Sequence, residues 1–115
     1  MSDCIFCQIA KGEVPARVVY EDDEVVAFED INPQVPVHVL VIPRQHYNDI
    51  GDDVPEALLG HLLAVAARVA QEKGVAETGY RLLTNIGEDG RQTVGHLHMH
   101  VLGGAKMPVR MGPAD

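Results

Sequence analysis

Long apolar runs are missing from this chain, and basic residues are scarce. No stretch approaches the roughly 18 consecutive apolar residues that a membrane-spanning helix needs. The first residues also lack the basic and apolar regions of a secretory signal. We therefore expect a cytoplasmic protein with no membrane partner. Nine lysines and arginines stand against 17 acidic residues, for a net charge of −8. Because binding along a nucleic-acid backbone needs clustered basic residues, polymeric DNA or RNA is not an expected partner.

Only two cysteines are present, Cys4 and Cys7, and they have Cys-x-x-Cys spacing. In a cytoplasmic chain of 115 residues, such a pair favours thiol chemistry or a metal over a structural disulfide. A redox pair of the thioredoxin type is expected after a strand, in a β-α-β context. No strand is indicated before Cys4, so the redox interpretation has less support than the metal interpretation.

The spacing of apolar residues predicts one domain over residues 1–104 and a short tail over 105–115. Helical spacing indicates a short helix over 4–11 and a long helix over 54–73. Because the strands and helices are segregated along the chain, the expected fold class is α+β with a mainly antiparallel, five-stranded sheet. The expected strands cover residues 18–20, 25–28, 37–42, 80–85 and 96–101.

Three local expectations accompany these elements. Asp53 and Glu56 have the spacing of a capping box at the start of the long helix. The acidic run over 21–24 is expected to be a solvated hairpin tip, and His61 on the long helix is expected to be a surface residue.

Three of the six histidines alternate with apolar residues near the C-terminal end of the domain: His96, His98 and His100. Successive side chains of a strand point to opposite faces, so the three imidazoles share one face, with neighbours about 6.7 Å apart. Such a row has three interpretations: a hydrogen-bonded ladder without chemistry, a metal site, or nucleophilic catalysis by one imidazole.

The loop before this row carries groups that suit an anion. Gly87 and Gly90 allow close approach of the backbone, and Gln92 and Thr93 bring donors to the edge of the row. Gly-x-x-Gly alone is a weak signal. The longer pattern Asn-x-Gly-x-x-Gly-x-Gln-Thr-Val-x-His-x-His-x-His is far more specific.

The run from His96 to Leu102 resembles the His-φ-His-φ-His-φ-φ pattern of the histidine triad (HIT) family, where φ is apolar. The resemblance extends through residues 30–33, 38–43 and 85–94, and it covers about residues 4–104. The chain looks most similar to the Hint-like branch, whose members bind nucleotides and hydrolyse nucleoside phosphoramidates. The resemblance implies a HIT-like fold and a homodimer in which two five-stranded sheets form one of ten strands. The tail over 105–115 is expected to pack at the dimer interface.

The resemblance also implies roles for individual residues. His98 would attack the α-phosphorus and form a nucleotidyl-histidine, which water then hydrolyses. His100 would contact the phosphate and help to deliver a proton to the departing amine. Thr93 would stabilise charge on the phosphate oxygens, and His38 would orient the triad from behind. The implied nucleotide-binding residues, besides His98 and His100, are Asp30 at the ribose, Asn85, Gln92, Thr93 and Val94 toward the phosphate, and Ile5, Phe6, Ile9, Phe28 and Ile31 around the base.

Members similar to this chain bind zinc through a Cys pair and two histidines, which here are Cys4, Cys7, His46 and His96. Four protein ligands leave no open position, so the implied zinc is structural and takes no part in the chemical step. Relatives usually carry Gly where this chain has Arg91, and a large residue where it has Gly95.

The implied function is hydrolysis of the P–N bond of purine nucleoside 5′-phosphoramidates. Two alternatives stay open on the sequence alone. One is a zinc-dependent hydrolase that uses the histidine row as metal ligands. The other is a nucleotide-binding adaptor whose activity is incidental.

Overall fold

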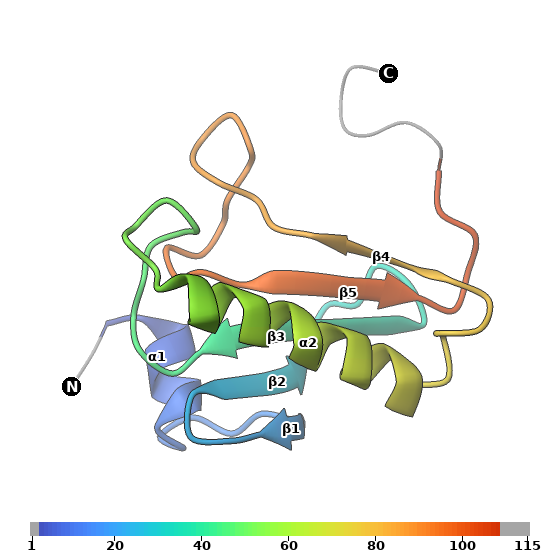
Figure 1. The fold of residues 1–115 in the computed structure, drawn as a ribbon, viewed down its shortest axis with the longest axis horizontal. Coiled ribbons are helices and arrows are strands. Elements are labelled where there is room, and N and C mark those ends of the chain that lie inside the picture. Colours follow the sequence, from blue (N-terminus) through green and yellow to red (C-terminus); the bar gives the residue numbers. More distant parts are fainter. Residues whose placement is uncertain (1–2, 109–115) are drawn as a thin grey trace.

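The computed structural model describes residues 3–108, which form two helices and five strands (Figure 1). Every expected helix and strand is present, although the bounds of several differ by a few residues. The elements are α1 (Ile5–Ala10), β1 (Val18–Glu21), β2 (Val25–Glu29), β3 (Val37–Pro43), α2 (Glu56–Glu72), β4 (Tyr80–Leu83) and β5 (Met99–Gly103).

The strands form one sheet in the order β1-β2-β3-β5-β4, and every neighbouring pair is antiparallel. The expected α+β class and five-stranded antiparallel sheet are confirmed. Helix α2 lies across one face of the sheet (Figure 1). Within residues 3–108, neither helix has the length and apolar character that a bilayer span requires.

Alternation along β2 and β3 divides the core into two clusters, one on each face of the sheet. Val25 and Val39 belong to the larger cluster, which packs against α2. Phe28 and Leu40 point the other way and pack with Phe6 of α1. Helix α1 therefore covers only a corner of the second face, and the functional side chains lie on that face.

The strand expected from residue 96 begins later, at Met99. Residues 96–98 lie outside the β3–β5 ladder because their main-chain groups bond elsewhere: Leu97 N–H donates to Tyr47 O (2.7 Å), and His98 O accepts from Thr84 Oγ1 (2.8 Å). The alternation of side chains nevertheless holds. Leu97 packs into the α2 cluster, whereas the rings of the histidine row share the opposite face with Phe6.

The start of α2 differs from the expected capping box. Its N-cap is Pro55, and no side chain caps the helix. Asp53 adopts a φ of 51°, in the left-handed region, which turns the chain before the helix begins. A proline N-cap offers no side-chain oxygen, so the helix N-terminus gains only the favourable charge of Glu56 in its first turn.

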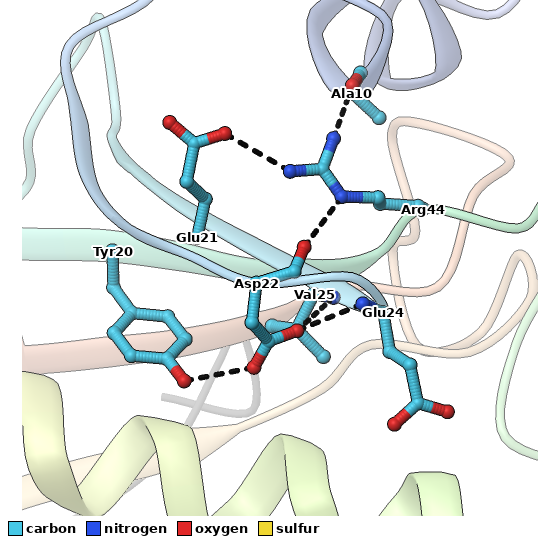
Figure 2. Close-up of polar contacts among 7 residues, drawn as sticks. All are labelled: Ala10, Tyr20, Glu21, Asp22, Glu24, Val25 and Arg44. Atoms are coloured by element: carbon cyan, nitrogen blue, oxygen red, sulfur yellow. Dashed lines mark hydrogen bonds and ion pairs between the residues drawn. The ribbon is translucent and has the colours of Figure 1, made fainter.

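The tip of the β1–β2 hairpin is ordered by Asp22 rather than merely solvated (Figure 2). Its Oδ1 accepts from the main-chain N–H groups of Glu24 and Val25, both at 2.8 Å. Its Oδ2 accepts from Tyr20 Oη–H (2.8 Å) and lies 2.6 Å from Nε2 of His61. Partial burial raises the Asp22 pKa, but these hydrogen bonds outweigh that effect and hold it well below its usual range. His61 therefore ties α2 to the hairpin and is not an unengaged surface residue.

Arg44, directly after β3, anchors α1 to the hairpin (Figure 2). Its guanidinium donates to Ala10 O at the end of α1 (2.6 Å) and to Asp22 O (2.7 Å), and it pairs with Glu21 (2.9 Å). This fork fixes the C-terminal end of a helix that is only six residues long. The position of α1 matters because Phe6 on this helix reaches the functional face.

Candidate active site and metal centre

An open cleft of about 900 Å³ lies on the face of the sheet that carries α1. Its walls come from α1, residues 14–17, the end of β2 with the loop that follows it, and residues 93–100. The sequence-predicted residues that line it are Ile5, Phe6, Ile9, Phe28, Asp30, Ile31, Thr93, Val94, His98 and His100. Ile31 is 92% exposed, so it lies at the rim and is not a core residue.

Three of the predicted catalytic and nucleotide-binding residues do not line the cleft. The side chain of Gln92 holds two loops together: Oε1 accepts from Gly87 N–H (3.0 Å), and Nε2 donates to Asn48 O (2.7 Å) and Val94 O (3.0 Å). Asn85 is partly buried away from the lining. His38 is buried and contacts His100, with His38 Nε2 2.9 Å from His100 Nδ1.

Sequence reasoning missed one wall of the cleft, formed by Val14, Pro15, Ala16 and Arg17. This segment belongs to no helix or strand and has no periodicity that could place it on a face. Gly12, with a φ of 75°, terminates α1 and redirects the chain toward residues 14–17. This glycine is the local sequence feature that indicates a change of chain direction before the wall. The other lining residues that were missed are Glu29, Pro33 and Leu40.

The loop over 86–94 depends on backbone conformations that few residues adopt. A Cβ on Gly90 would lie 2.4 Å from Ile86 O, so only glycine fits the turn. Gly87 has a φ of 69° and Arg91 a φ of 61°. Arg91, the departure from the glycine usual in relatives, therefore occupies a left-handed conformation that an L side chain strains to adopt.

His98 is buried and has one defined hydrogen bond. Its Nδ1 lies 2.7 Å from the main-chain O of His96, so Nδ1 carries the proton and donates. Neutral imidazole has one N–H, so Nε2 keeps its lone pair. The ring is held by an edge contact with Phe6 and a contact with His100, at centroid distances of 5.1 and 5.0 Å. The arrangement leaves His98 a nucleophilic nitrogen.

His100, His38 and Asp30 form a chain of contacts beside His98. His38 Nε2 lies 2.9 Å from His100 Nδ1 and 3.4 Å from Asp30 Oδ2. The other ring nitrogen of His100, Nε2, is buried and has no hydrogen-bond partner among residues 3–108. A buried donor without a partner costs about 1–3 kcal/mol, so this nitrogen suits an acceptor on a bound ligand.

Burial keeps both of these histidines neutral at pH 7. It lowers the pKa of His100 to about 4, helped by the nearby His98 and His38 rings and opposed by the Asp30 carboxylate. Burial likewise lowers the pKa of His38, against the opposing effect of Asp30. Both rings therefore act through hydrogen bonds rather than through positive charge.

A second cluster brings together Cys4, Cys7, His46 and His96. Their candidate ligand atoms all lie within 4.8 Å of one another. Cys4 Sγ lies 3.3 Å from His96 Nδ1, and Cys7 Sγ lies 3.2 Å from His46 Nδ1 and 3.5 Å from His96 Nδ1. The four residues that the sequence grouped as metal ligands are thus brought together.

The two imidazoles of this cluster present lone pairs to the sulfurs. His96 Nε2 donates to Pro43 O (2.9 Å), and His46 Nε2 faces Asn48 Oδ1 (3.2 Å), so in both rings Nδ1 faces the thiols. With Zn–S near 2.3 Å and Zn–N near 2.05 Å, tetrahedral geometry places sulfur and nitrogen about 3.6 Å apart. The observed sulfur–nitrogen separations of 3.2–3.5 Å therefore fit a Cys₂His₂ metal site.

The imidazoles of the histidine row do not converge on one point. His96 Nδ1 faces the thiols, His98 Nδ1 bonds to a main-chain carbonyl, and His100 Nδ1 bonds to His38. Within residues 3–108, His96 and His100 belong to two different groups of candidate ligands, and His98 belongs to neither. The geometry therefore does not support a metal held by the three histidines of the row.

Comparison with known proteins gives a consistent result. The HIT domain family model matches residues 11–107. Purine nucleoside phosphoramidase of Escherichia coli (strain K12) is 46% identical over 105 residues, which cover 89% of this chain and 87% of that protein. Protein HitA of Neisseria gonorrhoeae is 44% identical over 105 residues, covering 90% and 97%. The crystal structure of a HIT family hydrolase from Legionella pneumophila superposes with a TM-score of 0.92 at 46% identity, covering 96% of this chain and all of that one.

Proposed function

The chain belongs to the HIT domain family and is a homologue of purine nucleoside phosphoramidase, and on this premise we propose that it hydrolyses the P–N bond of purine nucleoside 5′-phosphoramidates. The observation that carries the proposal is the state of His98. Its Nδ1–H is committed to a carbonyl, and its Nε2 is left as a nucleophile beside an open cleft. A nucleophile of this kind needs no general base, because the attacking nitrogen carries no proton.

In the proposed first step, His98 Nε2 attacks the α-phosphorus as the P–N bond breaks. The departing amine takes one proton from solvent, and His100 Nε2–H, beside His98, helps to deliver it as a hydrogen-bond donor to the departing group. His100 keeps its own proton, because a neutral imidazole has a single N–H. Attack leaves positive charge on the His98 ring, 5.0 Å from His100 between centroids. In the second step, water attacks the nucleotidyl-histidine, one water proton returns to solvent, and nucleoside monophosphate and neutral His98 are released.

The rest of the cleft suits a nucleotide. Asp30 presents a carboxylate for the ribose hydroxyls, and the edge-to-face pair of Phe6 and Phe28 (centroids 5.4 Å apart) gives an apolar wall for the base. Thr93 lies on the lining and is proposed to hold the phosphate oxygens with Val94. Gln92 is proposed to act indirectly, by fixing the loop that carries Thr93, and Asn85 remains a predicted contact at the phosphate end.

We propose that Cys4, Cys7, His46 and His96 hold a structural zinc ion. When bound, zinc would cross-link α1 to the segment that leads into the histidine row, because its ligands come from residues 92 positions apart. The chemical step is proposed to use His98 as the nucleophile, with no metal.

We also propose a homodimer in which two sheets join. β4 is an edge strand of the sheet and carries only partly buried residues, so its outer side is available for pairing. The predicted tail contacts this strand at one described point, where Arg81 on β4 donates to Pro108 O (2.9 Å). The rest of the tail, residues 109–115, lies outside the described residues. The cytoplasmic location stays a prediction.

Turnover of adenosine 5′-phosphoramidate by the purified protein tests the proposed function. His98→Asn, which keeps a polar side chain but loses the nucleophile, should abolish turnover and leave binding of adenosine monophosphate largely intact. Activity within tenfold of wild type, a barrier change of about 1.4 kcal/mol or less, would refute the assignment. Loss of turnover on chelation, with recovery on zinc addition, would instead favour a zinc hydrolase. A wild-type protein that binds the nucleotide but does not turn over would favour the adaptor.

A further inference from the structure

The loop between β2 and β3 brings a main-chain N–H onto His38. The N–H of Gln34 lies 3.1 Å from His38 Nδ1. A main-chain amide nitrogen can only donate, so His38 Nδ1 must present a lone pair to it. Because neutral imidazole carries a single N–H, the proton of His38 sits on Nε2.

The tautomer of His38 determines the tautomer of the next ring. His38 Nε2–H faces His100 Nδ1 at 2.9 Å, so His100 Nδ1 must accept. The proton of His100 is then on Nε2, the buried nitrogen that has no partner among the described residues. One backbone amide thus fixes the proton positions of two side chains and places a donor beside His98.

We infer that the main-chain N–H of Gln34 is a positioning group for catalysis, which locks His38 and His100 as a neutral pair with the proton of His100 on Nε2. The catalytic meaning of this lock rests on the proposed function, because Nε2–H is the donor assigned to the departing amine. The lock itself is a property of the resting protein.

The lock also resists protonation of the pair. A proton added to His38 Nδ1 would face the Gln34 N–H, and a proton added to His100 Nδ1 would face His38 Nε2–H. The titratable groups that face the two rings are Asp30, from the loop after β2, and the His98 ring. Asp30 Oδ2 lies at 3.4 Å from His38 Nε2, farther than His100 Nδ1, so it competes weakly for the same proton.

The backbone around Gln34 is well fixed. Asp30 N–H donates to His38 O (2.9 Å), and Asp30 Oδ1 accepts from Asn32 N–H (2.8 Å). Within residues 3–108, the Gln34 side chain donates only to Asn32 O (3.3 Å) and makes no hydrogen bond to either ring. Any residue except proline therefore supplies the same N–H, so replacement by alanine would not expose this role.

Nitrogen NMR of the ligand-free, metal-loaded wild-type protein tests the lock directly. Long-range ¹H–¹⁵N spectra distinguish the two neutral tautomers and the imidazolium. Both His38 and His100 should be in the Nε2–H form and unchanged between pH 5.5 and pH 8. A Nδ1–H tautomer of either ring, or a His100 imidazolium at pH 6, would overturn the inference.

Gln34→Pro removes the N–H, and Gln34→Ala is the matched control, because both lose the side-chain hydrogen bond and only proline loses the amide proton. With adenosine 5′-phosphoramidate, Gln34→Pro should lower kcat about tenfold, a barrier increase of about 1.4 kcal/mol, with little change in KM. It should also give a mixture of His38 tautomers, whereas Gln34→Ala should match wild type in both measurements. Equal kcat and identical tautomers in the two variants would refute the lock.

The two proposals fail separately. A wild-type protein with the expected tautomers but no turnover would refute the proposed function alone. An active protein whose rings have the other tautomers would refute the lock alone. If Gln34→Pro does not fold, the wild-type spectra still decide the question.

Discussion

Replacing His100 with glutamine tests how a partly buried, neutral imidazole affects stability against acid. The folded pKa of His100 is about 4, whereas its ordinary value is 6.5. The unfolded chain therefore takes up the proton first as the pH falls. The contribution of His100 to stability is complete above pH 6.5 and is lost progressively as the pH falls toward 4.

The size of this effect follows from the two pKa values. Between pH 7 and pH 5, such a histidine would lower the free energy of unfolding by about 1.8 kcal/mol. His100 is partly exposed, so solvent screening reduces the expected loss to about 1 kcal/mol. His38 and His96, whose pKa values burial also lowers, would add to the loss in the same direction.

The assay is urea unfolding of the wild-type protein and of His100→Gln at pH 7, 6 and 5, with matched metal content. The contributions of carboxylates, the metal site and the other histidines are common to both proteins and cancel in the difference. The wild-type protein should lose about 1 kcal/mol more stability than His100→Gln between pH 7 and pH 5. Parallel pH dependences in the two proteins would refute the claim that His100 is held neutral by its surroundings.

Three further predictions concern the metal, the assembly and the loop. The Cys4→Ser/Cys7→Ser double variant should bind little zinc by elemental analysis and melt several degrees below wild type, yet still cleave phosphoramidate below its melting temperature; a full zinc content in the variant would contradict the site. Light scattering at micromolar concentration should give twice the chain mass of 12.5 kDa, and a single-chain particle would contradict the dimer. Arg91→Gly should be about 1 kcal/mol more stable than Arg91→Ala in urea unfolding, because alanine retains the Cβ that is strained at a φ of 61°; equal stabilities would show that the strain is absent.

The fold could be predicted because the apolar periods are regular where the core is formed. Successive residues of β2 and β3 belong alternately to two buried clusters, so the position of each apolar residue along the strand indicates which face of the sheet it occupies. The histidine row was placed on the correct face by the same period. The strand was predicted to begin too early, at residue 96. The pattern of side chains does not show that Leu97 N–H donates to Tyr47 O instead of to a neighbouring strand.

Features that depend on distant partners were not predictable from local patterns. His61 and Asp22 are 39 positions apart, and no period links them. The segment over 14–17 follows α1, whose end accepts a hydrogen bond from the distant Arg44, and no local pattern shows that this segment lines the cleft. The predicted capping box is absent. Asp53 adopts a left-handed backbone conformation in the turn before α2, and no side chain makes a capping hydrogen bond.

His96 joins the two centres through one residue. Its side chain faces the thiols, and its carbonyl holds the proton of His98. Phe6, which lies between the two cysteines in sequence, touches both rings, at centroid distances of 6.0 and 5.1 Å. A coloured ion such as cobalt, bound at the cysteine cluster, would therefore be an optical reporter placed one peptide carbonyl from His98, the proposed nucleophile. Its absorption bands would then follow the proposed nucleotidyl-histidine as it forms and decays during turnover, with no label on the substrate.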